Sequence, residues 1–160
     1  GQLRLSSDAF ERARGRMERP TPRVALGRTL RGVAHAAIDL SDGLLGDLGH
    51  ILKASGVGAD IDTRWLAQAN DGDTPWPAHC PDLAALPWAQ TLACGLTGGD
   101  DYELLFTAAP EHRAAVLAAA QASATPVTRI GRITPHGFRV LDPQGQAIDV
   151  SGLASFDHFA

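Results

Sequence analysis

One stretch limits the fold of this chain more than any other. Between residues 36 and 52, a short apolar run is followed by a polar turn and then by an amphipathic helix pattern. The apolar residues of that helix recur at the spacing of one helical face, and they are Leu44, Leu45, Leu48, Ile51 and Leu52. Ser41 or Asp42 is the expected N-cap, because its side-chain oxygen can accept hydrogen bonds from the first free backbone N–H groups. The pattern therefore predicts a strand that leads through a tight turn into a helix.

The polar turn is itself a candidate site for phosphate and metal. An extended backbone places Asp39 and Ser41 on the same side of the strand, and Asp42 follows directly. Helix N-termini attract phosphate, and paired carboxylates bind the hard cations that phosphate chains also bind. This combination favours a magnesium–nucleotide edge. The alternative is a purely structural turn, because Asp-Gly turns and Ser or Asp caps are common.

A second acidic turn lies further along the chain. Asp100 and Asp101 follow two glycines, which permit a tight turn, and precede a strand expected over residues 102–107. Adjacent like charges repel, so such a pair needs a cation, a nest of backbone amides or full solvation. Glu103, on the strand face of Leu105, is either a buried, paired carboxylate or an edge residue. A solvated turn without function is the alternative for the whole segment.

The composition is that of a globular protein of one domain. Its 160 residues are 44% hydrophobic and 20% charged, which is enough apolar sequence for a core. A net charge of -4 argues against a broad nucleic-acid surface. No apolar run is long enough to span a bilayer, and the start has no signal-peptide pattern. Two cysteines, Cys80 and Cys94, cannot form a disulfide framework, which favours a reduced, cytoplasmic setting.

Helix and strand patterns alternate along the rest of the chain. Helices are expected over residues 8–14, from 21 onward, over 87–94 and over 110–122. Strands are expected over 57–62, 127–133, 137–141 and 147–150, with the last two forming a hairpin. This alternation predicts an α/β (α+β) fold, in which a mixed β-sheet is packed with helices.

Charged residues outside the two turns have simpler interpretations. Asp60 and Asp62 alternate with apolar residues in the strand 57–62, so we expect them to face solvent or a turn rather than a metal. The first part of the chain is rich in arginine, which predicts either a surface that faces phosphate or a partner, or simply a solvated helix face. These arginines are Arg4, Arg12, Arg14, Arg16, Arg19, Arg23, Arg28 and Arg31.

The two acidic turns and the C-terminal tail together resemble the thiamine-monophosphate kinases. The similar segments are residues 38–44, 47–52, 98–104 and 156–159, in the same order as in that family. The first segment alone is shared with aminoimidazole ribonucleotide synthetase and selenophosphate synthetase, whereas the combination is more specific. The resemblance covers nearly the whole chain. It implies that residues 1–160 form a single domain, the C-terminal domain of a longer two-domain kinase with the aminoimidazole ribonucleotide synthetase-like fold.

The resemblance also implies an activity, the ATP- and magnesium-dependent phosphorylation of thiamine monophosphate to thiamine diphosphate. Asp39 and Asp42 would be magnesium ligands, and Ser41 would contact ATP. Asp100 and Phe156 would contact the thiamine phosphate. The family commonly has Glu at the position of Asp100, and Tyr or Trp at the position of Phe156. No catalytic acid or base is expected, because the acceptor phosphate oxygen is already anionic near neutral pH. Phosphoryl transfer between two anions needs cations and positioning instead.

The N-terminal domain of that family, which carries most of its metal-binding aspartates, has no counterpart in this sequence. The start at Gly1 without an initiator Met also favours a fragment. We therefore expect the activity in a parent protein, with this chain supplying one wall of the site and being inactive alone. The expected partners are ATP, thiamine monophosphate, the N-terminal domain and a second copy in a homodimer, with no nucleic acid and no membrane. The alternatives are another ATP-using member of the superfamily, acting on a purine intermediate or on selenium, and a non-catalytic binding domain.

Overall fold

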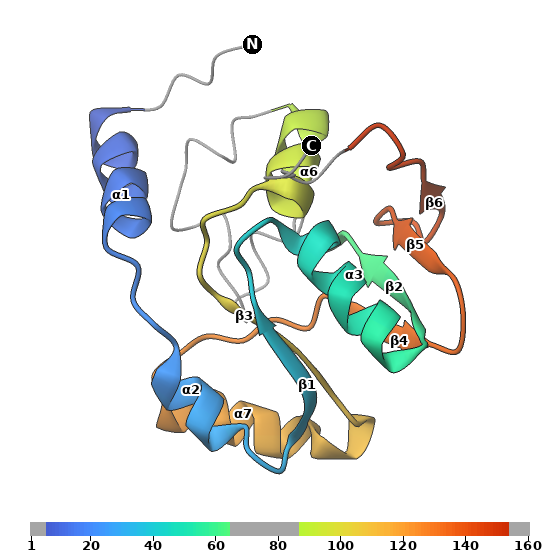
Figure 1. Ribbon diagram of the computed structural model, residues 1–160. Coiled ribbons are helices and arrows are strands. Elements are labelled where there is room, and N and C mark those ends of the chain that lie inside the picture. The colour runs from blue at the N-terminus through green and yellow to red at the C-terminus, as the bar shows by residue number, and fades with distance from the viewer. Residues whose placement is uncertain (1–5, 65–86, 154–160) are drawn as a thin grey trace.

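The computed structural model describes residues 6–64 and 87–153, and Figure 1 shows how their elements are arranged. In chain order the elements are α1 (Ser7–Glu18), α2 (Val24–Thr29), β1 (Ala34–Asp39), α3 (Leu44–Ser55), β2 (Gly58–Asp62), α6 (Trp88–Thr97), β3 (Leu104–Ala108), the 3-10 helix η2 (Pro110–His112), α7 (Arg113–Ala122), β4 (Gly131–Thr134), β5 (Phe138–Leu141) and β6 (Ala147–Ile148). The strand–turn–helix expected from the sequence is present as β1 and α3. The first helix continues through Gly15, beyond its expected end.

The described strands form two sheets. β1 pairs antiparallel with β3, and the second sheet has the order β4-β2-β5-β6. The second sheet is mixed, because β2 and β5 run parallel while its other pairs are antiparallel. β5 and β6 form the predicted hairpin. The predicted α/β fold, a mixed sheet packed with helices, is therefore confirmed, with a separate two-stranded sheet beside it.

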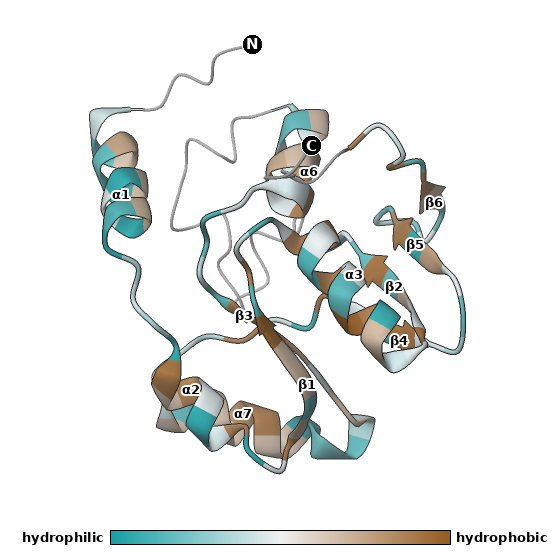
Figure 2. Ribbon diagram, in the orientation of Figure 1, coloured by the Kyte–Doolittle hydropathy of each residue, from teal (hydrophilic) through white to brown (hydrophobic). Residues whose placement is uncertain are grey.

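The larger hydrophobic core forms around α3. The leucine-rich face of this helix is buried, as its sequence pattern predicts. It packs against α6, β3 and the four-stranded sheet through Leu92, Leu96, Leu105, Ala59, Ile61 and Val140. Figure 2 shows the apolar colour on the elements around this helix. Full burial of one such side chain stabilises the fold by about 1.5–3 kcal/mol. Because this core contains residues of both sheets, its packing around α3 holds the two sheets together.

A smaller core lies between the two-stranded sheet and the pair of helices α2 and α7. Leu26 of α2, Leu30 at its C-cap and Ala119 of α7 are buried there, with Leu104 and Phe106 of β3 packed against them. Figure 1 shows α2 and α7 next to each other beneath the two strands. β3 is therefore covered on both sides, by α3 through one face and by α2 and α7 through the other.

Asp60, in the centre of the four-stranded sheet, is buried, so the prediction that it faces solvent is wrong. The residue is only 3% exposed. Its neighbours in the strand register, Arg132 of β4 and Arg139 of β5, form ion pairs with it at 2.9 and 2.8 Å. Hydrogen bonds from Arg139 and Arg132 lower the pKa of Asp60 to about 2. The charge can remain under these two side chains because it is paired.

No helix in the described part of the chain has both the length and the apolar character needed to cross a membrane.

Candidate functional site

The first turn, residues 40–43 between β1 and α3, is held by the side chain of Asp47. This residue is 2% exposed, and its Oδ2 accepts hydrogen bonds from the backbone N–H groups of Ser41 at 3.0 Å and Asp42 at 3.2 Å. The helix begins at Leu44 and its N-cap is Gly43. The prediction of Ser41 or Asp42 as N-cap was therefore wrong. A carboxylate inside the helix reaches back to the turn instead.

Gly43 allows the first turn to lie close to the end of α6. Its φ is 106°, a conformation that residues with a Cβ rarely adopt. A Cβ at this position would lie 2.9 Å from the backbone carbon and oxygen of Thr97, the last residue of α6. The glycine thus brings the first turn against the point where the second turn, residues 98–103, begins.

The second turn lies directly beside the first. The N–H of Asp100 donates to the carbonyl oxygen of Ser41 at 2.9 Å. The N–H of Tyr102 donates to the carbonyl oxygen of Leu40 at 2.8 Å, and the N–H of Leu40 donates to that of Glu103 at 2.8 Å. These bonds extend the antiparallel pairing of β1 and β3 beyond the ends of the strands. Two acidic turns that are far apart in the sequence therefore form one continuous surface.

Two residues of the second turn have left-handed backbones without being glycine. The φ of Asp100 is 62° and that of Tyr102 is 51°, conformations that cost about 1–3 kcal/mol each and persist only where the surroundings hold them. The Tyr102 hydroxyl donates to Oδ1 of Asp100 at 3.0 Å. This hydrogen bond and the charge of Asp100 raise the pKa of Tyr102, and the charge of Asp39 adds to the rise. The hydroxyl is thus hydrogen-bonded within the second turn, and the negative charge of Asp39 also acts on it.

Four of the five site residues predicted from the sequence, Asp39, Ser41, Asp42 and Asp100, lie in or next to the two paired turns. Asp39 and Asp100 are exposed, whereas Ser41 and Asp42 are partly buried. Phe156 lies outside the described residues. The carboxylate and hydroxyl oxygens of the first turn suit Mg²⁺, which prefers oxygen donors and commonly takes only one or two carboxylates beside phosphate oxygens. Among the described residues, no three His, Cys, Asp or Glu side chains form a group that could hold a metal ion. The described residues at and before the first turn thus supply oxygen atoms but no complete metal cluster.

Glu103 is a paired and half-buried carboxylate, one of the two alternatives that its sequence position left open. Nε and Nη2 of Arg23 donate to its two oxygens, each at 2.7 Å. Arg16 of α1 forms a further ion pair with the same carboxylate. Burial alone would raise the pKa of Glu103, but hydrogen bonds from Arg23 and Arg16 hold it below its usual value. These two arginines of the N-terminal region are therefore paired with Glu103 and not merely solvated.

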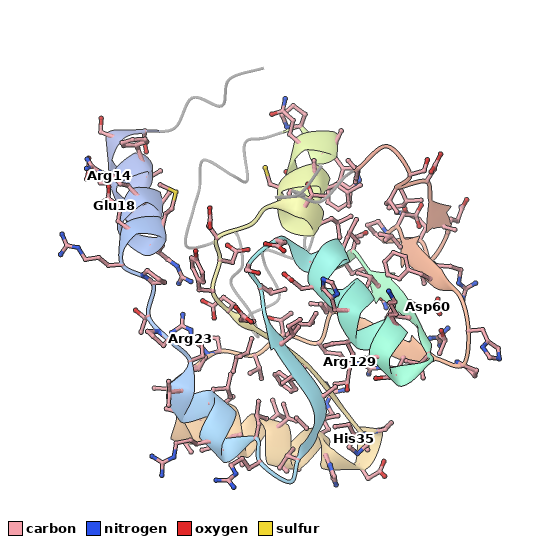
Figure 3. The ribbon with its side chains drawn as sticks, in the orientation of Figure 1. Arg14, Glu18, Arg23, His35, Asp60 and Arg129 are labelled. Carbon is pink, nitrogen blue, oxygen red and sulfur yellow. The ribbon has the colours of Figure 1, made fainter. Side chains whose placement is uncertain are left out.

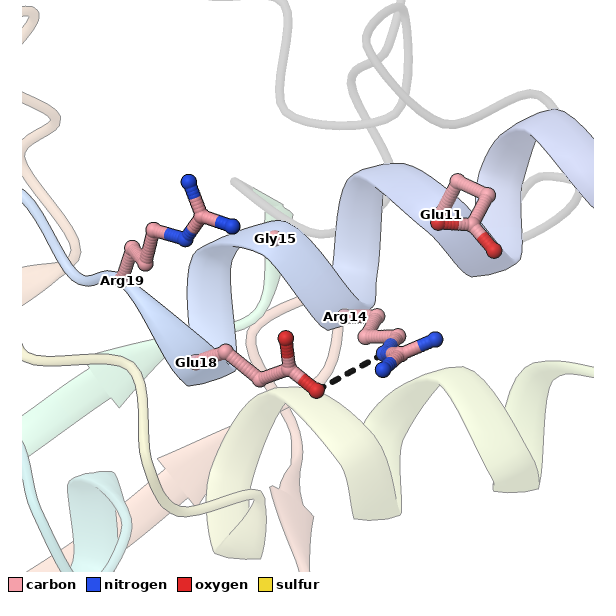
Figure 4. Close-up of a pocket in the computed structure, with 5 residues that line it drawn as sticks. All are labelled: Glu11, Arg14, Gly15, Glu18 and Arg19. Atoms are coloured by element: carbon pink, nitrogen blue, oxygen red, sulfur yellow. Dashed lines mark hydrogen bonds and ion pairs between the residues drawn. The ribbon is translucent and has the colours of Figure 1, made fainter.

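Two hollows on the surface of the described chain lie away from both turns. Figure 4 shows the larger, of about 510 Å³. It is lined by Glu11, Arg14, Gly15, Glu18 and Arg19, all of which belong to α1 or cap it. The smaller, of about 250 Å³, runs along the outer edge of β1 and the end of α2. Among the described residues, neither hollow is lined by a residue of the two turns.

Three parts of this site were not assigned from the sequence. The fold-back of Asp47 had a weak local signal, because an acidic residue in the first helical turn often binds free N–H groups. Tyr102 had none, since its left-handed backbone is set by the pairing of the two turns. The pairing of Arg16 and Arg23 with Glu103 spans 87 and 80 residues, and no local pattern can reveal it.

Comparisons with known proteins found similar sequences and similar structures. A family model described as AIR synthase related protein, C-terminal domain, matches residues 4–142. The chain is 43% identical over 145 residues to the thiamine-monophosphate kinase of Salmonella typhimurium strain LT2, which covers 89% of this chain and 41% of that protein. The crystal structure of thiamine-monophosphate kinase from Stenotrophomonas maltophilia K279a is similar with a TM-score of 0.71 and 42% identity, over 91% of this chain and 42% of that one.

A third comparison concerns the fold alone. AaThiL complexed with AMPPCP and TMP has a TM-score of 0.62 and 24% identity, over 92% of this chain and 42% of that one. The chain therefore spans about two fifths of the length of these relatives.

Proposed function

The chain belongs to the family of AIR synthase-related C-terminal domains, and we propose that it is the C-terminal domain of a two-domain thiamine-monophosphate kinase. The whole protein would transfer the terminal phosphoryl group of ATP to thiamine monophosphate and so form thiamine diphosphate. One observation carries this proposal: the two acidic turns, joined by the hydrogen bond from Asp100 to Ser41, form one surface. The 43% identity to a thiamine-monophosphate kinase supports the choice of acceptor.

The first turn would serve the nucleotide. Asp39 and Asp42 would hold Mg²⁺, and the Ser41 hydroxyl would contact a phosphate of ATP. Bound Mg²⁺ would offset the negative charge that accumulates between the two phosphate groups. Asp47 would keep the turn in shape, because it binds the N–H groups of Ser41 and Asp42. The exposure of Asp39 supports this role, since a metal ligand must be reachable from solvent.

The second turn would serve the acceptor. Thiamine monophosphate carries a cationic thiazolium ring, which an exposed carboxylate such as Asp100 attracts. Tyr102 orients that carboxylate by donating to one of its oxygens. Phe156 would stack on the ring, a contact worth about 0.5–2 kcal/mol; this role comes from the resemblance of the tail. The acceptor oxygen needs no general base, because it is already ionised near neutral pH.

The rest of the site would come from an N-terminal domain. The chain covers only 41% of the Salmonella kinase, and the described residues hold no complete metal cluster, which supports a shared site. We also propose that the whole protein is a cytoplasmic homodimer that contacts neither membrane nor nucleic acid. The dimer would form mainly through the N-terminal domain.

The test is a substrate panel on the full-length protein that contains this chain. The protein is incubated with ATP and Mg²⁺ and, in separate reactions, with thiamine monophosphate, selenide, or the ribonucleotide substrate of aminoimidazole ribonucleotide synthetase. We expect that only thiamine monophosphate is phosphorylated. Chromatography of thiamine diphosphate measures this reaction. Turnover of selenide or of the ribonucleotide would instead support another ATP-using activity of the superfamily. No turnover of any substrate would support a non-catalytic binding domain. The isolated 160-residue chain should unfold cooperatively but form no product.

A further inference from the structure

Arg16 and Arg23 tie the N-terminal part of the chain to the second turn. Both bind the carboxylate of Glu103, the last residue of that turn. The Arg23 contact is a two-pronged one, because Nε and Nη2 each meet a different carboxylate oxygen at 2.7 Å. Such a fork fixes the direction of the carboxylate as well as its position. The Arg23 side chain is only 20% exposed, so solvent competes weakly for it.

The main chain of Glu103 holds the second turn against the first. Its carbonyl oxygen accepts from the N–H of Leu40 at 2.8 Å, and the adjacent Tyr102 N–H donates to the carbonyl oxygen of Leu40 at 2.8 Å. Leu40 lies between Asp39 and Ser41 in the chain. A shift of Glu103 would therefore disturb the bonds that keep the two turns in register.

The left-handed residues of the second turn need such a restraint. Asp100 and Tyr102 pay a conformational cost that only surrounding contacts can offset. Arg16 lies close to the turn at a second point, where its Nη2 is 3.5 Å from the carbonyl oxygen of Asp101. Arg16 comes from α1, and Figure 3 shows Arg23 beside the start of α2. Two separate segments therefore hold one turn.

We propose that Arg16 and Arg23 are positioning residues for the phosphate acceptor, which fix Glu103 and thereby hold Asp100 and Tyr102 against the first turn. The part that concerns the acceptor rests on the proposed function. Neither arginine needs to touch the acceptor, because each acts through Glu103. Their removal should weaken acceptor binding while the nucleotide side of the surface, held separately by Asp47, keeps its shape.

Kinetics of the full-length protein test the acceptor role. Arg23→Gln should raise the KM for thiamine monophosphate about tenfold, the effect of losing one charge-assisted hydrogen-bonded pair. The KM for ATP should change by less than about twofold in the same variant. Arg23→Lys should be intermediate, because an ammonium keeps the charge but cannot form the fork. Arg14→Gln is the matched control, since Arg14 pairs with Glu18 on the exposed side of α1 and should alter neither KM.

Hydrogen exchange tests the restraint without any assay of activity. In Arg23→Gln and Arg16→Gln, the amides of Asp100 and Tyr102 should exchange faster than in Arg14→Gln. The amides of Ser41 and Asp42, which Asp47 binds, should exchange at the same rate in all three variants. Unchanged exchange at the second turn would overturn the proposal, as would equal increases in both KM values. If the wild-type protein does not act on thiamine monophosphate, the proposed function and the acceptor role both fail. Faster exchange in the arginine variants would then leave only the structural link.

Discussion

The backbone N–H of Asp100 donates a 2.9 Å hydrogen bond to the carbonyl oxygen of Ser41. This bond joins the two acidic turns, so that they lie side by side. The approach is close enough to demand a glycine beside it, because a Cβ on Gly99 would lie 2.6 Å from the same oxygen. Substitutions at the contact between the turns should therefore affect stability and ligand binding together.

Gly43→Ala should destabilise the full-length protein by about 1–3 kcal/mol, because the φ of 106° disfavours any residue with a Cβ and the new carbon would meet the backbone of Thr97. Urea unfolding, followed by circular dichroism, measures this loss. Gly49→Ala is the matched control on the same helix, since a Cβ there would have no heavy atom within 4 Å. That control should gain about 0.5–1 kcal/mol from better helix propensity. Equal effects of the two alanines would contradict the argument.

Asp47→Ala should loosen the first turn, because it leaves the N–H groups of Ser41 and Asp42 without their acceptor. Loss of a buried acceptor costs about 1–3 kcal/mol. The KM for ATP should rise more than the KM for thiamine monophosphate, since Asp47 supports the nucleotide side of the surface. Asp47→Asn keeps one oxygen that can accept both hydrogen bonds, so its effect should be smaller. An alanine variant with wild-type stability and an unchanged KM for ATP would show that the turn holds its shape without Asp47.

The elements that the sequence predicted well are those with local causes. The apolar period of Leu44, Leu48 and Ile51 defines α3 and its buried face, and Gly56, with its left-handed φ of 65°, ends the helix. The acidic turns could also be identified from their residues. Their contact could not, because the pairing of β1 with β3 brings them together, and no pattern within either segment specifies that partner.

The errors have the same physical origin. The N-cap was assigned to Ser41 or Asp42 because local rules consider only the side chain before the helix, whereas Asp47 folds back from within it. Asp60 was expected to face solvent because it alternates with apolar residues. Its cover comes from Arg132 and Arg139, which are 72 and 79 residues away in the sequence. Charge pairs between strands are decided by register, which a single strand does not encode.

Asp60 should make stability fall in acid. Its pKa in the folded protein is about 2, below the ordinary value of 3.8, so the folded state holds the proton less tightly than the unfolded chain. The stabilisation is therefore fully present above about pH 4 and is lost as the pH falls toward 2. Asp60→Asn should lose about 1–3 kcal/mol at pH 7 and show a shallower decrease between these pH values. Urea unfolding across this pH range gives the comparison, and a variant with the wild-type pH dependence would contradict the role of Asp60.

Asp39→Asn and Asp42→Asn, made in the full-length protein, should reduce turnover far more than stability. Asp39 is exposed, so its charge contributes little to folding. Loss of a magnesium ligand would remove a cation that offsets the charge between two phosphates, an effect worth about 3–4 kcal/mol of barrier. Rates measured against Mg²⁺ concentration, together with thermal unfolding, separate the two effects. Glu18→Gln neutralises an exposed carboxylate on α1 outside both turns and should leave the magnesium dependence unchanged. Near-normal activity at limiting Mg²⁺ would remove that aspartate from the metal site, whereas failure to fold would support the purely structural turn.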